Sequence, residues 1–428
     1  MKHMFSDVTP FRRNPLDFLA QFETCDEPLV PLALGPRPVL LLTDPAFVKR
    51  ILKTPEQEVN KGRLIRTLRS VIGDSVVILN GAEHRRRRKV LHPFLSRSGA
   101  ERMAPTFLAE IRRSAAMVAR DTDFDADLFG AALALRLVSI AVFGHRVLSS
   151  GDEQSLVQAV RLIEDDVADE IFRTLPAMPW TAWAQRRRRR AAREAMQLIV
   201  ARVRGSTGET SAMQALAALD LDDTATANEV LTLLLAGHHT TGAAVAWMLH
   251  ALATQPGLAR ALAAEARAIT SSTGELDIAQ LATAVKSLAA AREILRLYPS
   301  SWWFSREVQQ PIEIGGRKLK PGTSILISPW LFHRSARHWD APDEFRLDRG
   351  YNTPAYCPFG AGPRACVGMG LALLELQLIA LEMAASFELS VLPGQNLRPN
   401  PMVMLMPPRI RMRARPRDSA TANGICAA

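Results

Sequence analysis

The sequence predicts a mainly α-helical protein with small antiparallel β-sheets, folded as one domain over residues 1–428. Most of the segment 98–300 is rich in Ala, Leu, Arg and Glu, with apolar residues at helical spacing. The last third instead contains short alternating segments between Gly-Gly and Pro-Gly turns, which are typical of hairpins. No internal repeat or long low-complexity linker divides the chain, and large single-domain enzymes reach this length.

A strand is expected first, over residues 37–45, and the long helical region follows it. Within that region a helix over 227–255 is opened by a capping box of Thr226 and Glu229. At 1.5 Å per residue this helix measures roughly 40 Å, so it must run through the core. Its central sequence GHHTTG places polar groups inside the protein, where each costs free energy unless it is satisfied.

The last third supplies the other strands. Alternating patterns predict strands within 311–330, over 388–393 and within 401–414. The tail over 416–428 is expected to be disordered.

The chain is strongly basic, with a net charge of +10 and a pI near 9.9. Such a charge favours nucleic acid, an anionic membrane surface or an acidic protein as a partner. No basic stretch interleaves aromatic residues as a base-stacking site would, so we expect no nucleic-acid binding. The basic residues lie in three local runs: 84–89, 186–190 and 409–417.

The four cysteines form no CxxC pair, and a chain of this length does not need disulfides to fold. The N-terminus has no apolar segment of the kind found in signal peptides. No uninterrupted apolar stretch of about 18 residues predicts a transmembrane helix. These observations favour a cytoplasmic protein, with peripheral membrane contact left open.

One cysteine, Cys366, lies in the glycine-rich sequence FGAGPRACVGMG over residues 359–370, directly before an apolar helical pattern. A nucleophilic cysteine would need a histidine base, but no histidine lies within 25 residues. A zinc site would need three more ligands, and only Cys357 is close. A single thiolate suits haem iron, because the porphyrin supplies four donors and a flat macrocycle needs a loop without side chains. The helix that starts at about Val367 would help to stabilise the thiolate.

This loop resembles the haem loop of the cytochrome P-450 family, F-G-x-G-x-R-x-C-x-G. From average composition, six fixed residues at this spacing recur by chance about once in 10⁸ positions. The resemblance covers nearly the whole chain and implies a triangular, mainly α fold with haem b between the long central helix and the cysteine loop. It implies Cys366 as the iron ligand and three loop residues as haem contacts: Phe359, Gly360 and Gly368.

A second segment, EILR, matches the E-x-x-R pattern of the family through Glu293 and Arg296. With Arg349 these residues resemble the buried Glu-Arg-Arg cluster that holds the family's fold behind the haem. The chain departs from the pattern beside Arg349, where Leu347 and Gly350 replace a proline and an aromatic residue. An i,i+3 surface salt bridge is the alternative for Glu293 and Arg296.

The resemblance implies four partners for the haem propionates: His84, Arg88, Arg306 and Arg364. His84 and Arg88 lie one helical turn apart and so share a face. For the neighbouring basic residues we favour a solvated helix face, and the alternative is docking of an acidic electron-transfer protein. These neighbours are Arg85, Arg86, Arg87 and Lys89.

The long helix carries AGHHTT over residues 236–241, which resembles the family's [AG]-G-x-[DE]-T-[ST]. Gly237 fits a groove for dioxygen, and Thr240 takes the position whose hydroxyl supports proton delivery. His239 replaces the family's acid and is a candidate proton relay. The alternatives are that Thr240 only bonds back to a carbonyl and that the two histidines are core residues.

The implied function is a monooxygenase that inserts one oxygen atom of dioxygen into a lipophilic small molecule, terpenoid or fatty-acid-like. We expect electrons from a separate ferredoxin and ferredoxin reductase, with NAD(P)H used only through them, and a monomeric chain. Peroxide-driven or isomerising chemistry is a second reading, and a non-catalytic haem carrier or sensor is a third. The expected pocket walls are Ile72, Val76, Leu235, His238, Trp302, Trp303, Met402 and Met404. Core packing is an equal alternative for the two tryptophans.

Overall fold

In the computed structural model, residues 2–62, 64–118, 123–171, 178–203, 211–272 and 274–417 are described. The expected disordered tail lies outside these residues except for its first two positions. There the prediction is wrong, because Pro416 pairs with Phe387 in a β-sheet and the N–H of Arg417 donates to the carbonyl of Ser386.

Short helices and strands form the N-terminal part, where the sequence alternates brief apolar runs with Pro, Gly and Asp. Their bounds are η1 Lys2–Phe5, α1 Val8–Arg13, α2 Pro15–Ala20, β1 Leu29–Leu32, β2 Val39–Leu42, η2 Pro45–Phe47, α3 Val48–Lys53, β3 Val59–Asn60 and α4 Leu64–Ile72.

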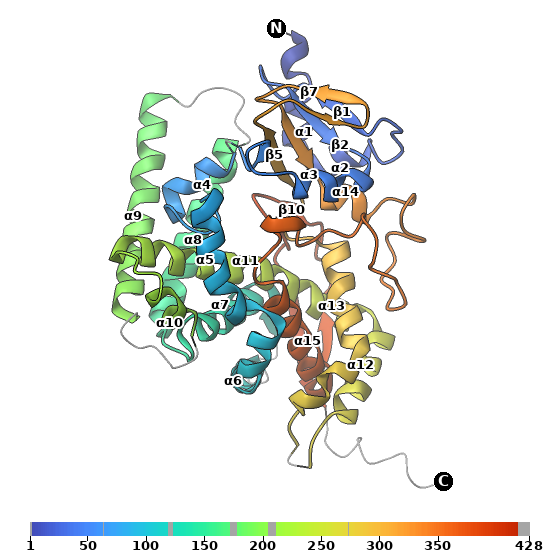
Figure 1. The fold of residues 1–428 in the computed structure, drawn as a ribbon. Helices are drawn as coiled ribbons and strands as arrows, with labels where there is room; N and C mark the ends of the chain where they lie inside the picture. Colours follow the sequence, from blue (N-terminus) through green and yellow to red (C-terminus); the bar gives the residue numbers. More distant parts are fainter. Residues whose placement is uncertain are drawn as a thin grey trace.

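A helical body follows and makes up most of the molecule (Figure 1). Its elements are α5 Gly81–Leu95, α6 Arg97–Val118, β4 Asp123–Asp125, α7 Ala126–Phe143, α8 Ser150–Ile171, α9 Pro179–Val203, α10 Ala212–Ala217, α11 Asp223–Thr254, α12 Pro256–Ala268, η3 Ile278–Thr283 and α13 Val285–Leu297.

The last third contains strands and the final long helix. Its elements are β5 Phe304–Val308, β6 Ile312–Ile314, β7 Arg317–Leu319, β8 Ser324–Ile327, α14 Pro329–His333, η4 Gly362–Arg364, α15 Met369–Ser386, β9 Phe387–Val391, β10 Asn400–Pro401, β11 Leu405–Met406 and β12 Arg411–Pro416.

The sheets join parts of the chain that are far apart in the sequence. Five strands form one sheet in the order β1-β2-β8-β5-β3, in which β2 and β8 run parallel with Leu40 opposite Ile325. Strand β12 lies between β4 and β9 in a second sheet, and β6–β7 and β10–β11 are two-stranded. The prediction of small antiparallel sheets is confirmed for the other named strand pairs, and among these pairs it is wrong for β2 and β8.

The long central helix α11 begins four residues before its predicted start and ends one residue early. The side chain of Asp222 caps it by accepting a hydrogen bond from the N–H of Ala225. The predicted capping box of Thr226 and Glu229 is wrong, because both lie inside the helix. Glu229 is instead buried and bonded elsewhere, as described below.

Helix α11 crosses the molecule and packs closely on α7 (Figure 1). Gly130 of α7 and Gly242 of α11 allow this approach. A Cβ at Gly130 would lie 2.5 Å from the carbonyl oxygen of Gly242, closer than any side chain permits. The glycines therefore set the distance between these helices.

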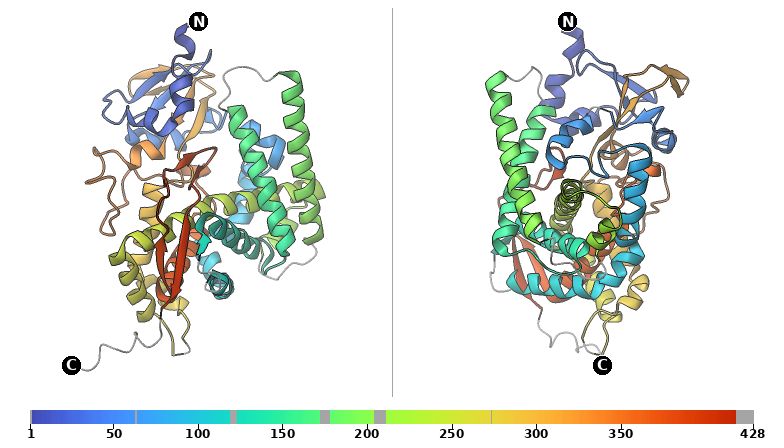
Figure 2. Two further views of the ribbon diagram at one scale, coloured as in Figure 1. Left: turned by 180° about the vertical axis from the view of Figure 1, so that it is seen from behind. Right: turned by 60° about the vertical axis from the view of Figure 1, so that its left-hand side comes forward.

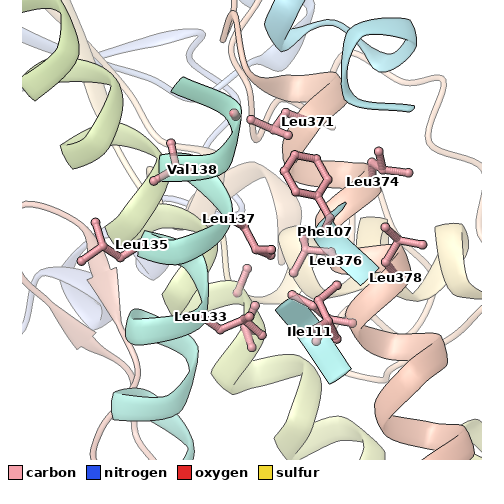
Figure 3. Close-up of a cluster of buried hydrophobic side chains, with 14 of the residues drawn as sticks. Phe107, Ile111, Leu133, Leu135, Leu137, Val138, Leu371, Leu374, Leu376 and Leu378 are labelled. Atoms are coloured by element: carbon pink, nitrogen blue, oxygen red, sulfur yellow. The ribbon is translucent and has the colours of Figure 1, made fainter. Parts of the chain in front are cut away.

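The main apolar core lies between α6, α7 and α15 (Figure 3). Phe107 of α6, Leu137 of α7 and Leu376 of α15 are all buried there. Helices α7 and α15 are long and apolar enough to cross a membrane by length and composition, yet 78% and 61% of their apolar windows are buried inside the fold. A position in the protein core explains their composition.

Candidate active site around Cys366

The Cys366 loop turns tightly beside α3. The N–H of Cys366 donates to the carbonyl of Phe359 at 2.9 Å, and the N–H of Gly360 donates to that of Cys357 at 3.0 Å. Gly360 and Gly362 have φ of +65° and +70°, a region that L side chains rarely adopt. A Cβ at Gly362 would also lie 2.5 Å from the carbonyl oxygen of Leu52. The glycines are thus required by the turn and by its contact with α3.

The thiol of Cys366 is accessible, although protein atoms surround it closely. Burial raises its pKa, and the N–H of Gly368 together with the charges of Arg88 and Lys61 opposes this rise. Helix α15 begins directly afterwards, at Met369, with Gly368 as its N-cap. The positive end of a helix favours an anion at this point. The sulfur of Cys366 can therefore act as a metal ligand, and a bound cation would stabilise its thiolate form.

Basic side chains gather near this thiol and repel one another. Burial and the charges of Arg364 and Arg306 lower the pKa of Lys61 to about 7. Burial also lowers the pKa of His84 to about 4 and that of Arg306 to about 10, and Arg364 acts in the same direction on both. Among the described residues, Glu56 is the one carboxylate that acts on all three.

The basic residues Lys61, His84, Arg88, Arg306 and Arg364 are together called the cation cluster. Although His84 is neutral, the others carry more positive charge than Glu56 can neutralise. Glu56, Lys61, Arg306 and Arg364 line one narrow cavity, and Arg88 is close enough to Cys366 to affect its pKa. A ligand with two carboxylates and a metal would neutralise both the cluster and the thiolate. The residues present therefore fit haem, with its two propionates, between Cys366 and the cluster.

Arg364 is already well bonded within the protein. Its guanidinium forms an ion pair with Glu56 and donates to the carbonyl of Leu79 and to the side chain of Asn80. His84 is buried, and Arg88 lies next to it on the same side of α5. The predicted propionate partners are thus brought to one place, where Arg364 also fixes the loop.

Arg87 is not on a solvated face, so that prediction is wrong for this residue. It is buried and donates to Glu229 of α11 at 2.7 Å and to Glu83 at 2.7 Å. Glu229 also accepts the N–H of Val76 at 2.8 Å. This buried pair connects α5, α11 and the segment before α5. Arg85, Arg86 and Lys89 are exposed, as predicted.

The centre of α11 is accessible at Ala236, Gly237 and Thr240, although most of the surrounding helix is buried. The hydroxyl of Thr240 donates to the carbonyl of Ala236 at 2.6 Å. Its oxygen can still accept a hydrogen bond from another donor. A Cβ atom at Gly237 would lie only 2.5 Å from the Cγ2 atom of Val138 on α7. The packing of α11 on α7 is therefore sufficient to require glycine at this position.

His238 and His239 are buried side by side, with ring centroids 4.7 Å apart. Burial holds the pKa of His238 well below its usual value, so its ring is neutral. Neither ring nitrogen of His238 has a hydrogen-bond partner among the described residues. It lies about 200° around the helix from Ala236 and Thr240, which does not support His238 as a pocket wall.

Glu293, Arg296 and Arg349 come together behind the loop. Arg296 donates to both oxygens of Glu293 at 2.8 Å, and both side chains are completely buried. Arg349 donates to Glu293 at 2.9 Å. The alternative of a surface salt bridge is therefore wrong. The guanidinium of Arg296 also donates to the carbonyl of His333, which ties α13 to the end of α14.

A family model described as cytochrome P-450 matches residues 4–413. The chain belongs to the cytochrome P-450 family. Cyclooctatin synthase from Streptomyces melanosporofaciens is 28% identical over 426 residues, covering 95% of this chain and 92% of that protein. Pentalenene oxygenase from Streptomyces avermitilis is 27% identical over 429 residues, with 94% and 93% covered. The crystal structure of CYP175A1 from Thermus thermophillus matches with a TM-score of 0.78 and 25% identity, covering 98% of this chain and 99% of that one.

The cytochrome P-450 family implies haem and dioxygen, and the Cys366 loop and cation cluster fit that cofactor. The residues expected to line the substrate pocket differ in how far they are buried. Ile72 and Val76 are buried, and Leu235, Trp303, Met402 and Met404 are half-buried. Trp302 is completely buried in the N-terminal core, and its Nε1 donates to the carbonyl of Met402 at 3.0 Å, so core packing accounts for it.

Two residues of this cytochrome P-450 site were missed from the sequence. Lys61 has no motif around it and enters the cluster only through the fold. Glu56 accepts from the N–H of Gly81 at 2.6 Å and pairs with Arg364. Arg364 lies about 300 residues further along the chain, so no local pattern could have shown this pairing.

Proposed function

We propose that this monooxygenase oxidises an apolar, ring-containing terpenoid-like molecule with electrons from a separate ferredoxin and its reductase. The observation that carries the proposal is the accessible Cys366 loop beside the cation cluster, followed directly by helix α15, which packs on α11. This arrangement has places for a macrocycle, its two carboxylates and a substrate.

The residues take distinct roles. Cys366 holds the iron, and haem when bound supplies the oxidation chemistry. Lys61, Arg88 and Arg306 bind the propionates as charge-assisted donors, and neutral His84 adds a hydrogen bond. Thr240 positions a proton on the accessible side of α11. The half-buried Leu235 and Met404 exclude water from the substrate and suit an apolar molecule.

Two relatives support the substrate class. One relative is named cyclooctatin synthase and the other pentalenene oxygenase. The ending of the word pentalenene denotes an alkene, which is an apolar kind of substrate. The half-buried wall residues of this chain are mostly apolar. Three arginines spaced three residues apart, Arg63, Arg66 and Arg69, could anchor a substrate carboxylate if one of them pointed inward. Arg69 instead pairs with Asp74 at 2.7 Å and is exposed. Arg63 and the side chain of Arg66 lie outside the described residues.

The spectrum of the reduced holoenzyme with carbon monoxide tests the site. We expect the red-shifted Soret band of a thiolate-ligated haem, and its loss in Cys366→His. Cys357→Ser is the matched control, because Cys357 is buried nine residues earlier and should leave the band in place. A histidine-type band in the folded wild type, or an unchanged band in Cys366→His, would refute the assignment.

Turnover with terpene alkenes tests the reaction. We expect product only when ferredoxin, reductase and NAD(P)H are all present. Product with peroxide alone at the same rate would favour the peroxide-driven reading. Absence of any product despite a normal spectrum would favour a haem carrier or sensor.

The exposed residues Arg85 and Lys89 are the proposed docking contacts for an acidic ferredoxin, since neighbouring Arg88 lies close to Cys366. Turnover should fall as salt rises, and Arg85→Glu/Lys89→Glu should remove most of that dependence. Arg411→Glu/Arg415→Glu is the control, with equal charge change on β12. Equal salt dependence in both variants and the wild type would refute docking at Arg85 and Lys89. It would leave the proposed reaction unaffected. The cytoplasmic location and the monomeric state stay predictions.

A further inference from the structure

Ser300 lies between the end of α13 and the start of β5, and its buried side chain contacts the centre of α11. Its hydroxyl donates a hydrogen bond to the main-chain carbonyl of Thr240 at 2.9 Å. A helix carbonyl already accepts the N–H four residues later, so the hydroxyl of Ser300 uses the second lone pair of this oxygen. Thr240 is therefore bonded from outside its own helix, at the residue whose hydroxyl we assign to proton transfer.

The backbone around Thr240 has little rigidity of its own, because Gly237 and Gly242 lie within three residues of it. Both glycines are needed where α11 packs on α7. The hydroxyl of Thr240 bonds within the same turn, to the carbonyl of Ala236 at 2.6 Å, so it does not fix this turn to the rest of the protein. The hydrogen bond from Ser300 supplies such a fixed point.

The segment that carries Ser300 is itself held firmly beside α11. Helix α13 lies next to α11 in the views of Figures 1 and 2. Two residues before Ser300, the ring of Tyr298 stacks on that of Trp247 in α11, with centroids 3.8 Å apart and planes 3° apart. Four residues before Ser300, Arg296 is bonded to the buried Glu293. These contacts fix the position of Ser300 relative to α11 independently of its own hydroxyl.

The same segment holds the hairpin formed by β10 and β11, which carries two expected pocket residues, Met402 and Met404. The carbonyl of Ser300 accepts the N–H of Leu405 at 2.8 Å. The indole Nε1 of Trp302 donates to the carbonyl of Met402 at 3.0 Å. Segment 300–302 therefore connects the expected substrate wall to the turn of α11 that contains Thr240.

We propose that Ser300 is a positioning residue for the oxidation: its hydroxyl fixes the turn of α11 from which Thr240 serves proton delivery. This inference rests on the role proposed above for Thr240. Monooxygenation takes one dioxygen, two electrons and two protons, and it places one oxygen atom in the substrate and the other in water. Release of hydrogen peroxide takes the same dioxygen, electrons and protons but leaves the substrate unchanged. A displaced proton donor should therefore shift turnover from product to peroxide without weakening substrate binding.

Two substitutions of equal shape isolate the hydroxyl. Ser300→Thr keeps a hydroxyl and Ser300→Val replaces it by a methyl group, so crowding by the added carbon is common to both. With a terpene alkene, ferredoxin, reductase and NAD(P)H, Ser300→Val should lower the ratio of product to hydrogen peroxide by about two- to tenfold, the factor that corresponds to one hydrogen bond. Ser300→Thr should keep the wild-type ratio. The Kd of the terpene, measured from the spectral shift on binding, should be the same in both variants.

A double variant tests whether Ser300 acts through Thr240. Thr240→Ala should itself lower the ratio, and Thr240→Ala/Ser300→Val should lower it no further, because residues that act as a unit are not additive. Ser287→Ala is the matched control. The hydroxyl of Ser287 is also buried and donates to the carbonyl of Ala284 at 2.8 Å, but it lies at the other end of α13. This control variant should keep the wild-type ratio.

Hydrogen exchange in the resting holoenzyme gives a readout without turnover. Ser300→Val should speed amide exchange in the turn of α11 that follows Thr240 by about two- to tenfold, because one hydrogen bond to that turn is lost. Ser300→Thr and Ser287→Ala should exchange there as the wild type does. This measurement needs no substrate, so it decides whether Ser300 fixes the turn even if no terpene alkene is oxidised.

Equal ratios in Ser300→Thr and Ser300→Val would overturn the proposal, as would a further fall in the double variant or unchanged exchange in Ser300→Val. If Thr240→Ala keeps the wild-type ratio, the proposed role of Thr240 fails together with this inference. If Thr240→Ala lowers the ratio and Ser300→Val does not, the inference about Ser300 fails alone.

Discussion

Glu375 of α15 illustrates how burial changes a single residue. Its side chain is buried beside Thr241 of α11, and burial raises its pKa to about 8 although the hydrogen bond with Thr241 lowers it. In the unfolded chain the pKa is near 4.5. The folded protein therefore holds an extra proton between these values. The stability contributed by this proton is complete below about pH 4.5 and is lost as pH rises through about 8.

Glu375→Gln should remove that pH dependence, because glutamine keeps the shape and carries no ionisable proton. The variant should gain stability over the wild type as pH rises toward about 8, by up to about 1.4 kcal/mol per pH unit. Urea unfolding at several pH values measures it. Glu388→Gln, at an exposed position of β9, serves as the control and should follow the wild type. Parallel curves for Glu375→Gln and the wild type would contradict this account.

For His239, a role in proton transfer can be distinguished by experiment from a role in packing alone. It lies next to Thr240, whose carbonyl accepts from the hydroxyl of Ser300 at 2.9 Å. If it relays protons, His239→Ala should slow product formation several-fold at saturating electron supply and change its pH profile. His238→Ala is the matched control, because it removes a neighbouring buried imidazole that lies about 200° around α11 from Thr240. That variant should lose stability by about 2–4 kcal/mol and keep its rate. An unchanged rate, coupling and pH profile in His239→Ala would end the relay hypothesis.

At the scale of elements, the Arg87–Glu229 pair joins α5 to α11. Each side chain is at most 8% exposed, so neither charge can be solvated by water if its partner is removed. Arg87→Met should lower the free energy of unfolding by about 3–5 kcal/mol, because Glu229 is left buried and unpaired.

The double variant Arg87→Met/Glu229→Leu should recover most of that loss, since no buried charge remains. Arg85→Met changes an exposed neighbour and should cost about 0.5 kcal/mol or less. Urea unfolding compares the three variants. If the double variant is as unstable as Arg87→Met, the buried charge is not the cause.

At the scale of the whole molecule, the sequence predicted the helical body, the position of α11 within a few residues and the strand β2. These features depend on local periodicity and on turn residues. It did not predict that β2 pairs with β8, because Leu40 and Ile325 meet only after the helical body has folded between them. The start of α11 was missed because Asp222 and Thr226 are both good N-cap residues.

In the candidate site, too, some residues could be identified from a local sequence motif and others only from the fold. The glycines around Cys366 form a dense local motif, so the loop could be found in the sequence. Lys61 and Glu56 have no motif, and Arg87 stands in a run of four arginines that are indistinguishable without the fold. Only tertiary packing decides that Arg87 faces Glu229 while Arg85 faces water.

The buried cluster around Glu293 connects α13 to the segment that follows α14. Glu293 accepts from Arg296, from Arg349 and from the hydroxyl of Tyr351 at 3.0 Å. Glu293→Ala leaves two buried arginines without a counter-charge, so we expect a loss of at least about 3–5 kcal/mol and a marked loss of bound haem.

Arg346→Ala is the matched surface control for this cluster. Its guanidinium pairs with Asp340 and Asp348, which are both largely exposed, so the loss should be below about 1 kcal/mol with haem content unchanged. Haem absorbance per protein and thermal melting measure both variants. The cluster holds the segment that leads into the Cys366 loop, so the haem loss should appear even in the fraction of Glu293→Ala that folds. Normal haem content in that fraction would show that the cluster stabilises the fold without positioning the loop.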